Sequence, residues 1–122
     1  MISQFAKLSS KPRVFLCHPA PVPNGRGKWG HNEKGILEEL PLIDKVAQEE
    51  KADVIDIHSA LLNHPELFPD NLHPADAGST VMAKTVFKAL TGKDYSGAEV
   101  ALPVPKPVVK PAAKLVEKKA KK

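Results

Sequence analysis

The sequence predicts an α/β fold built on parallel strands, and three observations carry this prediction. Two short apolar runs, Arg13 to Cys17 (RVFLC) and Ala52 to Ile57 (ADVIDI), are rich in strand-forming residues. A longer segment with apolar residues at helical spacing follows each run. The resulting order of strand, helix, strand and helix is typical of parallel strands covered by helices.

The chain begins with a short helix and a strand. Apolar residues at helical spacing predict a short helix in residues 1–10, which Lys11-Pro12 ends. The run from Arg13 to Cys17 then forms a buried strand. We expect Cys17, the only cysteine, to be a small buried side chain at the end of that strand. A single cysteine excludes an internal disulfide and a cysteine-based zinc site.

A long loop follows the first strand, because residues 18–32 hold three Pro and three Gly and show no periodicity. Within it, His18 and Trp29 are candidate substrate contacts. The alternatives are a solvated loop residue for His18 and an aromatic ring that simply covers the loop for Trp29. Asn32 is placed to cap a helix over residues 33–51, in which Pro41 predicts a kink or a fresh start.

The second strand, residues 52–57, leads into one or two helical turns at Ser59–Asn63 and a loop with three prolines. A final helix is expected from Pro74 to about Leu90. Pro suits the first helical position, Asp76 complements the helix dipole in the first turn, and Gly92 ends the helix. Two parallel strands leave open edges, which predicts aggregation or pairing with a complementing chain.

The composition changes near the C-terminus, where Lys, Pro, Ala and Val dominate. Seven Lys and one Glu give residues 101–122 a charge of +6, so the rest of the chain carries −2 of the net +4. We expect a short helix in residues 1–10, a partial domain in residues 11–96 and a disordered tail in residues 97–122. The tail is interpreted as a solubilising or wall-spanning linker, with weak contact to nucleic acid or acidic surfaces through residues 101–122 as the alternative.

The sequence contains no apolar stretch near the ~18 residues of a membrane span. Residues 1–10 also lack the charged start and apolar run of a secretory signal. As written, the chain is expected to be cytoplasmic and to make no membrane contact, whereas a full-length form could be secreted.

The stretch Asp70-Asn71-Leu72-His73 contains two residues that can form an acid–base pair. A carboxylate three residues before an imidazole can fold back and accept a hydrogen bond from Nδ1–H. It then fixes the tautomer and stabilises the imidazolium that forms when Nε2 takes a proton. The structural alternative is an Asp that caps the following helical region and a His that faces solvent.

The run from Phe68 to Gly78 (FPDNLHPADAG), with a helix expected after it, resembles the last conserved block of SGNH (GDSL-type) hydrolases. That block has an Asp, two residues, a His-Pro pair and a Gly early in the final helix. The strand ending VIDIH and the run RVFLCHPAPVP resemble the preceding strands and Pro-rich loop of the branch that includes carbohydrate O-acetylesterases. The resemblance extends from about Lys11 to Gly92.

The resemblance implies the C-terminal part of a flavodoxin-like three-layer sandwich with parallel strands. It implies a serine esterase or acylhydrolase with His73 as the general base and Asp70 as the residue that orients it. A small-molecule or carbohydrate ester, most simply an acetylated sugar, is the implied substrate. No cofactor is expected, and no metal either, because the spacings of the five His fit no zinc pattern.

The sequence departs from this family at the nucleophile, because the chain contains no G-D-S block and no G-x-N-D block. The six serines lie outside any such motif, so the nucleophile is unknown. We therefore expect the 122-residue chain alone to be inactive, and a mis-called start, a split gene and a degraded copy are the three explanations that the sequence leaves open. The alternative function is a non-catalytic remnant or interaction protein that binds through its basic tail.

Overall fold

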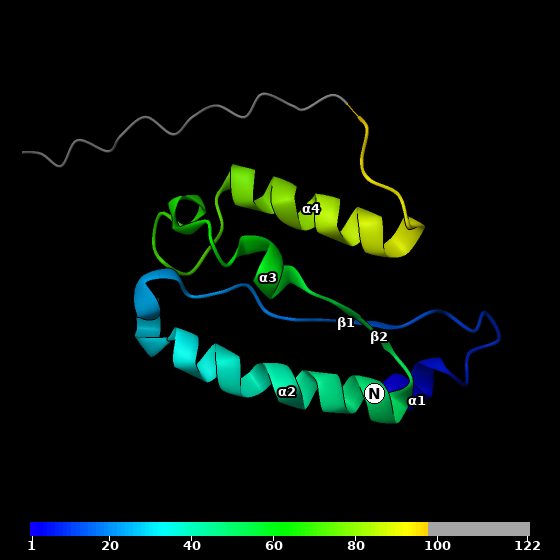
Figure 1. Ribbon diagram of the computed structural model, residues 1–122. Coiled ribbons are helices and arrows are strands. Elements are labelled where there is room, and N and C mark those ends of the chain that lie inside the picture. The colour runs from blue at the N-terminus through cyan, green and yellow to red at the C-terminus, as the bar shows by residue number, and fades with distance from the viewer. Residues whose placement is uncertain (98–122) are drawn as a thin grey trace, which may run out of the picture.

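A computed structural model describes residues 1–97, so the predicted tail and its proposed contacts lie almost entirely outside the described residues. The division of the chain into three parts therefore stays a prediction. Within this range the elements follow one another in the expected order (Figure 1). They are α1 (Ile2–Phe5), β1 (Phe15–Cys17), η1 (Pro23–Gly25), η2 (Lys28–Gly30), α2 (Glu33–Glu50), β2 (Asp53–Ile55), α3 (Ile57–Leu61), η3 (Pro65–Leu67) and α4 (Asp76–Thr91).

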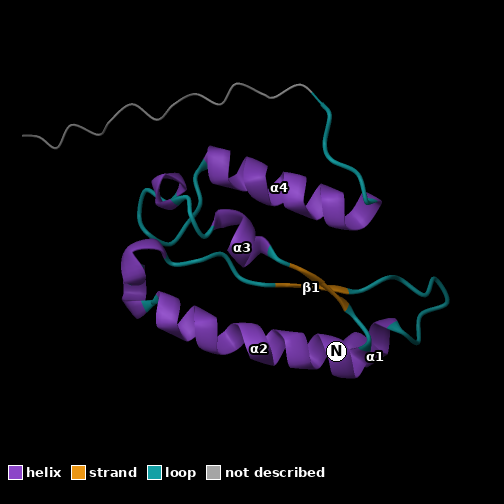
Figure 2. Cartoon of the chain, in the orientation of Figure 1, coloured by secondary structure: helices purple, strands orange, loops and turns teal. Residues whose placement is uncertain are grey.

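The two strands form a parallel sheet that lies between two layers of helices. β1 pairs with β2 in the register Phe15 to Asp53 and Cys17 to Ile55. Figure 2 shows α2 on one side of the strands and α3 with α4 on the other. The prediction of an α/β fold with parallel strands is confirmed.

The core is small and lies between β2, α3 and α4. Ile55, Ile57 and Leu61 are almost fully buried, and Phe68, from the loop after η3, joins them. Partly buried side chains of β1 and α4 complete the cluster. Burial of each such side chain contributes about 1.5–3 kcal/mol, so this cluster fixes the end of the sheet from which the Asp70–His73 loop emerges.

α2 begins where the sequence predicts, because the Asn32 side chain accepts a hydrogen bond from the Gly35 N–H at 2.9 Å. The helix runs through Pro41 as one element, so the predicted fresh start at that residue is wrong. Pro41 is exposed, and the packed face of α2 passes on the other side of the helix. Lys51, in the left-handed conformation, ends the helix.

α4 starts at Asp76 with Ala75 as its N-cap, two residues after the predicted start at Pro74. Ala75 keeps an extended backbone because its N–H donates to Leu67 O at 2.7 Å and ties the helix start to η3. Gly92 ends the helix with a φ of 69°, as predicted.

The described sheet has two strands, so the outer edge of β1 has no partner strand among the described residues. The His18 N–H donates to Ile55 O, so the alternation of a parallel ladder turns the backbone groups of Phe15 and Cys17 away from β2. Cys17 is exposed, which makes the prediction of a buried cysteine wrong. The physical reason is that α4 packs against β2, whereas no described strand lies beyond β1.

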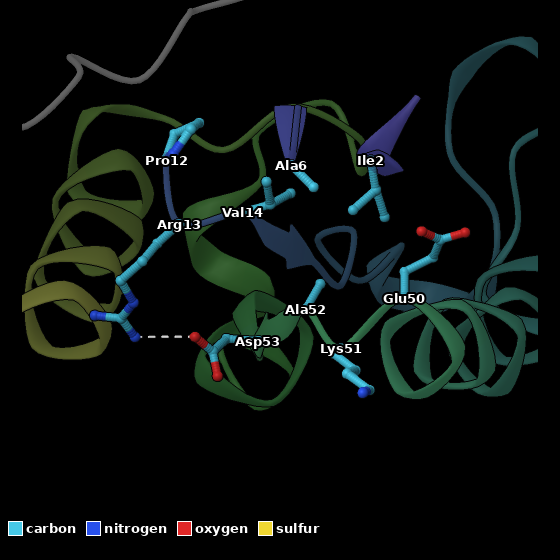
Figure 3. A pocket seen from close by; sticks show the side chains of 9 residues that line it. All are labelled: Ile2, Ala6, Pro12, Arg13, Val14, Glu50, Lys51, Ala52 and Asp53. Carbon is cyan, nitrogen blue, oxygen red and sulfur yellow. Dashed lines mark hydrogen bonds and ion pairs between the residues drawn. The ribbon is translucent and has the colours of Figure 1, made fainter. Parts of the chain in front are cut away.

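A hollow of about 320 Å³ lies at the amino ends of the two strands, between α1 and the end of α2. Figure 3 shows Ile2, Ala6 and Val14 turned toward it, while Arg13 and Asp53 form an ion pair to one side. In α/β proteins ligands bind outside the carboxyl ends of the strands. This hollow is at the opposite end, so it is not the candidate site.

Across the described residues, none of the helices combines the length and the apolar character that crossing a membrane requires.

The close approach of α4 to η3 predicts a specific cost for a larger residue at position 78. A Cβ at Gly78 would lie 2.7 Å from the Cβ of Pro74 and 3.4 Å from that of Leu67. Gly78→Ala should therefore lower the free energy of unfolding by about 1–3 kcal/mol, measured by urea denaturation. Gly35→Ala is the matched control, because its Cβ meets nothing closer than 3.7 Å. It should stabilise α2 by up to about 1 kcal/mol. Equal effects of the two substitutions would contradict the proposed packing.

Candidate acid–base site

The candidate site is the loop between η3 and α4, which two kinds of contact hold in place. Phe68 is 2% exposed and anchors the start of the loop in the core. Its carbonyl oxygen accepts a hydrogen bond from the Asn71 N–H at 3.0 Å, which closes a tight turn. Asn71 has a φ of 58°, a conformation that Asn tolerates better than most residues. The turn directs the Asp70 and His73 side chains to the same side of the loop.

Asp70 and His73 form the predicted pair. The Oδ2 atom of Asp70 lies 2.9 Å from His73 Nδ1, while Oδ1 accepts hydrogen bonds from the backbone N–H groups of Leu72 and His73 at 3.0 and 2.7 Å. The hydrogen bonds from the side chain and from the backbone of His73 hold the pKa of Asp70 well below its usual range. Asp70 is therefore a carboxylate at neutral pH.

The protonation of His73 follows from this geometry. A carboxylate can only accept hydrogen bonds, so Nδ1 must carry the proton that Asp70 binds. In the neutral imidazole, Nε2 then has a free lone pair. The His73 side chain is 62% exposed, so this lone pair is open to an incoming group. Among the described residues, no Ser, Thr or Cys side chain donates a hydrogen bond to Nε2.

The long loop after β1 packs against this turn. The Asn24 side-chain amide donates to Asn71 Oδ1 at 2.9 Å. Gly27 passes so close that a Cβ there would lie 2.7 Å from Asn71 O. Trp29 then meets His73 edge to face, with ring centroids 5.8 Å apart and an interplanar angle of 73°. The structure therefore brings the predicted Trp29 to the predicted His73.

The position of the long loop depends on Glu33, which sequence reasoning did not single out. Its Oε2 accepts a hydrogen bond from the Val22 N–H and its Oε1 contacts His58 Nε2, both at 2.6 Å. His58 is 3% exposed, so this contact lies in the interior of the protein. A Glu in the first turn of a helix is ordinarily explained by its favourable interaction with the helix dipole. The sequence therefore gave no indication that Glu33 also connects the long loop to α3.

His18 lies between two carboxylates and not in solvent. Its Nε2 is 2.9 Å from Asp44 of α2 and its Nδ1 is 3.2 Å from Asp56, which also caps α3. The side chain is 11% exposed, so the interpretation of His18 as a solvated loop residue is wrong. Both ring nitrogens are engaged, which gives His18 a structural position where β1, α2 and α3 meet. Its predicted contact with substrate stays a prediction.

The pKa of His18 is the result of opposing effects. Burial lowers it, but hydrogen bonds to Asp44 and Asp56 raise it more, so it ends above its ordinary value of 6.5. Burial raises the pKa of Asp56, but bonds from Ser59 and His18 bring it below the ordinary value. Nowhere in residues 1–97 do three or more His, Cys, Asp or Glu side chains gather in a way that suits a metal ion.

The chain was compared with known proteins. No family model matches it. The acetylxylan esterase of Xylanibacter ruminicola is 31% identical over 81 residues, which are 65% of this chain and 16% of that protein. The esterase domain of the ZfL2-1 ORF1 protein from the zebrafish ZfL2-1 retrotransposon superposes with a TM-score of 0.60 at 19% identity. That match covers 75% of this chain and 54% of the solved one.

The chain resembles SGNH-type carbohydrate esterases. Both comparisons support this, one through sequence and one through the fold, and they confirm the resemblance predicted from the run Phe68 to Gly78. The chain spans 16% of the curated relative and 54% of the solved domain.

The His18 cluster predicts a pH dependence of stability. Because the folded pKa of His18 is above its unfolded value, its stabilising contribution is complete below about pH 6.5 and is lost as pH rises through the folded pKa. The difference in free energy of unfolding between the wild type and His18→Gln should therefore shrink between pH 6 and pH 9. Urea denaturation at several pH values measures it. A difference that is constant or grows with pH would contradict the proposed ion pairs.

The Asp70–His73 geometry predicts the tautomer of His73. Two-bond ¹⁵N–¹H NMR above the pKa of the ring should show a proton on Nδ1 and none on Nε2 in the wild type. In Asp70→Asn the amide can donate to Nδ1, so the proton should move to Nε2. Asp76→Asn is the matched control, since Asp76 is the next acidic residue along the chain and makes no hydrogen bond to His73 in the structure. A wild-type ring protonated on Nε2 would refute the assignment.

Proposed function

We propose that this chain supplies the acid–base part of a serine-type ester hydrolase that acts on an acetylated carbohydrate. The observation that carries the proposal is the Asp70–His73 pair, with Nδ1 of His73 bound to a carboxylate at 2.9 Å and the His73 side chain 62% exposed. The similarity of the chain to an acetylxylan esterase supports ester hydrolysis as the reaction class.

In this proposal His73 acts as a general base and then as a general acid. Its Nε2 takes the proton of a serine hydroxyl as the serine oxygen attacks the ester carbonyl. Asp70 stabilises the imidazolium formed, and the ring then gives the proton to the departing sugar oxygen. The same nitrogen then takes a proton from a water molecule as the water attacks the acyl-serine. The imidazolium gives that proton to the departing serine oxygen, which releases the acetyl group as acetic acid and restores both the serine hydroxyl and the neutral His73. Such general acid–base catalysis is worth about 10²–10⁴-fold.

The serine and the oxyanion-binding groups are not among the motifs of this chain. The 122 residues contain no G-D-S block, and the family places its nucleophile there. In the proposed function these groups come from other polypeptide, joined to this chain or separate from it. We therefore expect the purified chain to hydrolyse 4-nitrophenyl acetate no faster than its His73→Ala variant. Turnover that depends on His73 would show that the chain holds a nucleophile of its own.

A carbohydrate ester is the substrate that the proposal favours. The relative's name states an acetylated xylan, and an exposed aromatic ring beside the proposed base suits a sugar ring better than a flexible acyl chain. No observation in the described residues favours a nucleic acid.

The experiment that tests this proposal joins the chain to the rest of an esterase, so that a nucleophile is supplied. In a chimera, the 81-residue matching segment of the acetylxylan esterase is replaced by the corresponding residues of this chain. Acetate release from acetylated xylan should fall about 10²–10⁴-fold in His73→Ala. Asp70→Asn should reduce it by up to about 10⁴-fold, because the wrong tautomer is then favoured.

The control for the chimera is His64→Ala. His64 is an exposed histidine near the same loop, where it pairs with Glu66 at 3.0 Å, and the proposal gives it no chemical role. Its removal should leave the rate unchanged. Circular dichroism establishes that each variant is folded. A folded, active chimera that keeps its rate without His73 would overturn the proposed function.

A further inference from the structure

A hollow of about 310 Å³ lies beside Trp29 at the start of α2. It is formed by the last residues of the long loop and the first two turns of α2. Its lining residues are Trp29, Gly30, His31, Asn32, Gly35, Ile36 and Glu39. Trp29 is thus shared between the hollow and the edge-to-face contact with His73.

Trp29 is held in an unusual way for a large aromatic residue. It is 77% exposed and has a φ of 56°, a left-handed backbone conformation that is a genuine outlier for a bulky side chain. Such strain persists only where the surrounding structure fixes it, and it gathers at binding and catalytic sites. Gly27, tight against Asn71, and Glu33, bonded to Val22, fix the loop on either side. The fold therefore holds the Trp29 indole ring in a solvent-exposed position beside His73.

The polar groups of the hollow differ in whether they already have partners. Asn32 is fully used, because it caps α2 and also donates to Gly30 O at 3.3 Å. In the described part of the chain the side chains of Glu39 and His31 make no hydrogen bond or ion pair. An exposed aromatic surface flanked by unused hydrogen-bonding groups is the combination that binds a sugar, whose ring has an apolar face and a rim of hydroxyl groups.

The charges of the side chains that line the hollow further restrict the class of ligand that it can bind. Among the described side chains that line it, Glu39 is the one carboxylate and none is a Lys or Arg. A negatively charged sugar would be repelled, whereas the hydroxyl groups of a neutral sugar can donate to the Glu39 carboxylate.

We propose that the hollow beside Trp29 is a subsite for one neutral sugar unit of the substrate. The indole packs on the face of the sugar ring, Glu39 accepts hydrogen bonds from its hydroxyl groups, and the ester-bearing part of the carbohydrate extends toward His73. The inference rests on the proposed function for the class of ligand, but sugar binding here needs neither the serine nor catalysis.

The chain offers a direct readout, because Trp29 is its only tryptophan. Titration of the 122-residue protein with acetylated xylotetraose should change the Trp29 fluorescence in a saturable way, with a dissociation constant in the millimolar range. Glu39→Gln should weaken binding several-fold. The matched control is Glu38→Gln, because Glu38 is on the same helix, pairs with Lys34 and does not line the hollow. It should bind like the wild type.

Two further measurements separate this inference from the proposed function. His73→Ala should still bind the tetrasaccharide, because His73 does not line the hollow. Xylotetraose that carries a glucuronic acid group on the bound unit should bind more weakly than the neutral sugar, unless Glu39 is replaced. A fluorescence signal that does not saturate, or that is the same in Glu39→Gln, would overturn the subsite. It would leave the role of His73 in the chimera untouched.

Discussion

The two 2.6 Å contacts of Glu33 are the interaction on which the arrangement of this site depends. The carboxylate stands in the first turn of α2, accepts a hydrogen bond from the Val22 backbone and meets the buried His58 of α3. It thereby joins the long loop, α2 and α3, which the chain separates widely. Burying a carboxylate is costly unless both oxygens are satisfied, and here each oxygen has a partner. With the loop held in this way, Trp29 contacts His73 and also lines the hollow at the start of α2.

The position of the candidate site relative to the sheet agrees with the general architecture of α/β domains. The loops that follow β1 and β2 hold the functional candidates, at the carboxyl ends of parallel strands where such folds bind ligands. The free edge of β1 and the exposed Cys17 lie where a further strand would pair. This chain matches 54% of the solved esterase domain. The absence of a G-D-S block in the sequence is consistent with the proposed function, in which this chain supplies the base and its orienting acid and other polypeptide supplies the nucleophile.

How far the sequence could predict the site depended on how far apart the partners are along the chain. Asp70 and His73 are three residues apart, so a single turn brings them together and the pattern D-x-x-H was enough. The Asn32 and Gly92 caps were predictable for the same reason. His18, Asp44 and Asp56 span 38 residues of the sequence. Val22 precedes Glu33 in the sequence and His58 follows it, so these partners are also far apart along the chain. Nothing in the local pattern of these residues distinguishes a partner from a solvated side chain. Cys17 was misjudged because its burial depends on a neighbour that the described sheet does not have.

The sequence by itself determined the type of the main helices and strands, the helix caps at Asn32 and Gly92 and the Asp70–His73 pair, because each depends on side chains within a few residues of one another. The parallel arrangement was predictable from the order of the strands and helices along the chain, not from a local pattern. Only the tertiary structure decided which residues support that pair. It placed Trp29 against His73, Glu33 between the loop and α3, and His18 between two helices. These contacts depend on the path of a 15-residue loop rich in Pro and Gly, residues 18–32, and that path is set by packing against the turn at Asn71. Local propensity does not determine such a path, so packing had to supply it.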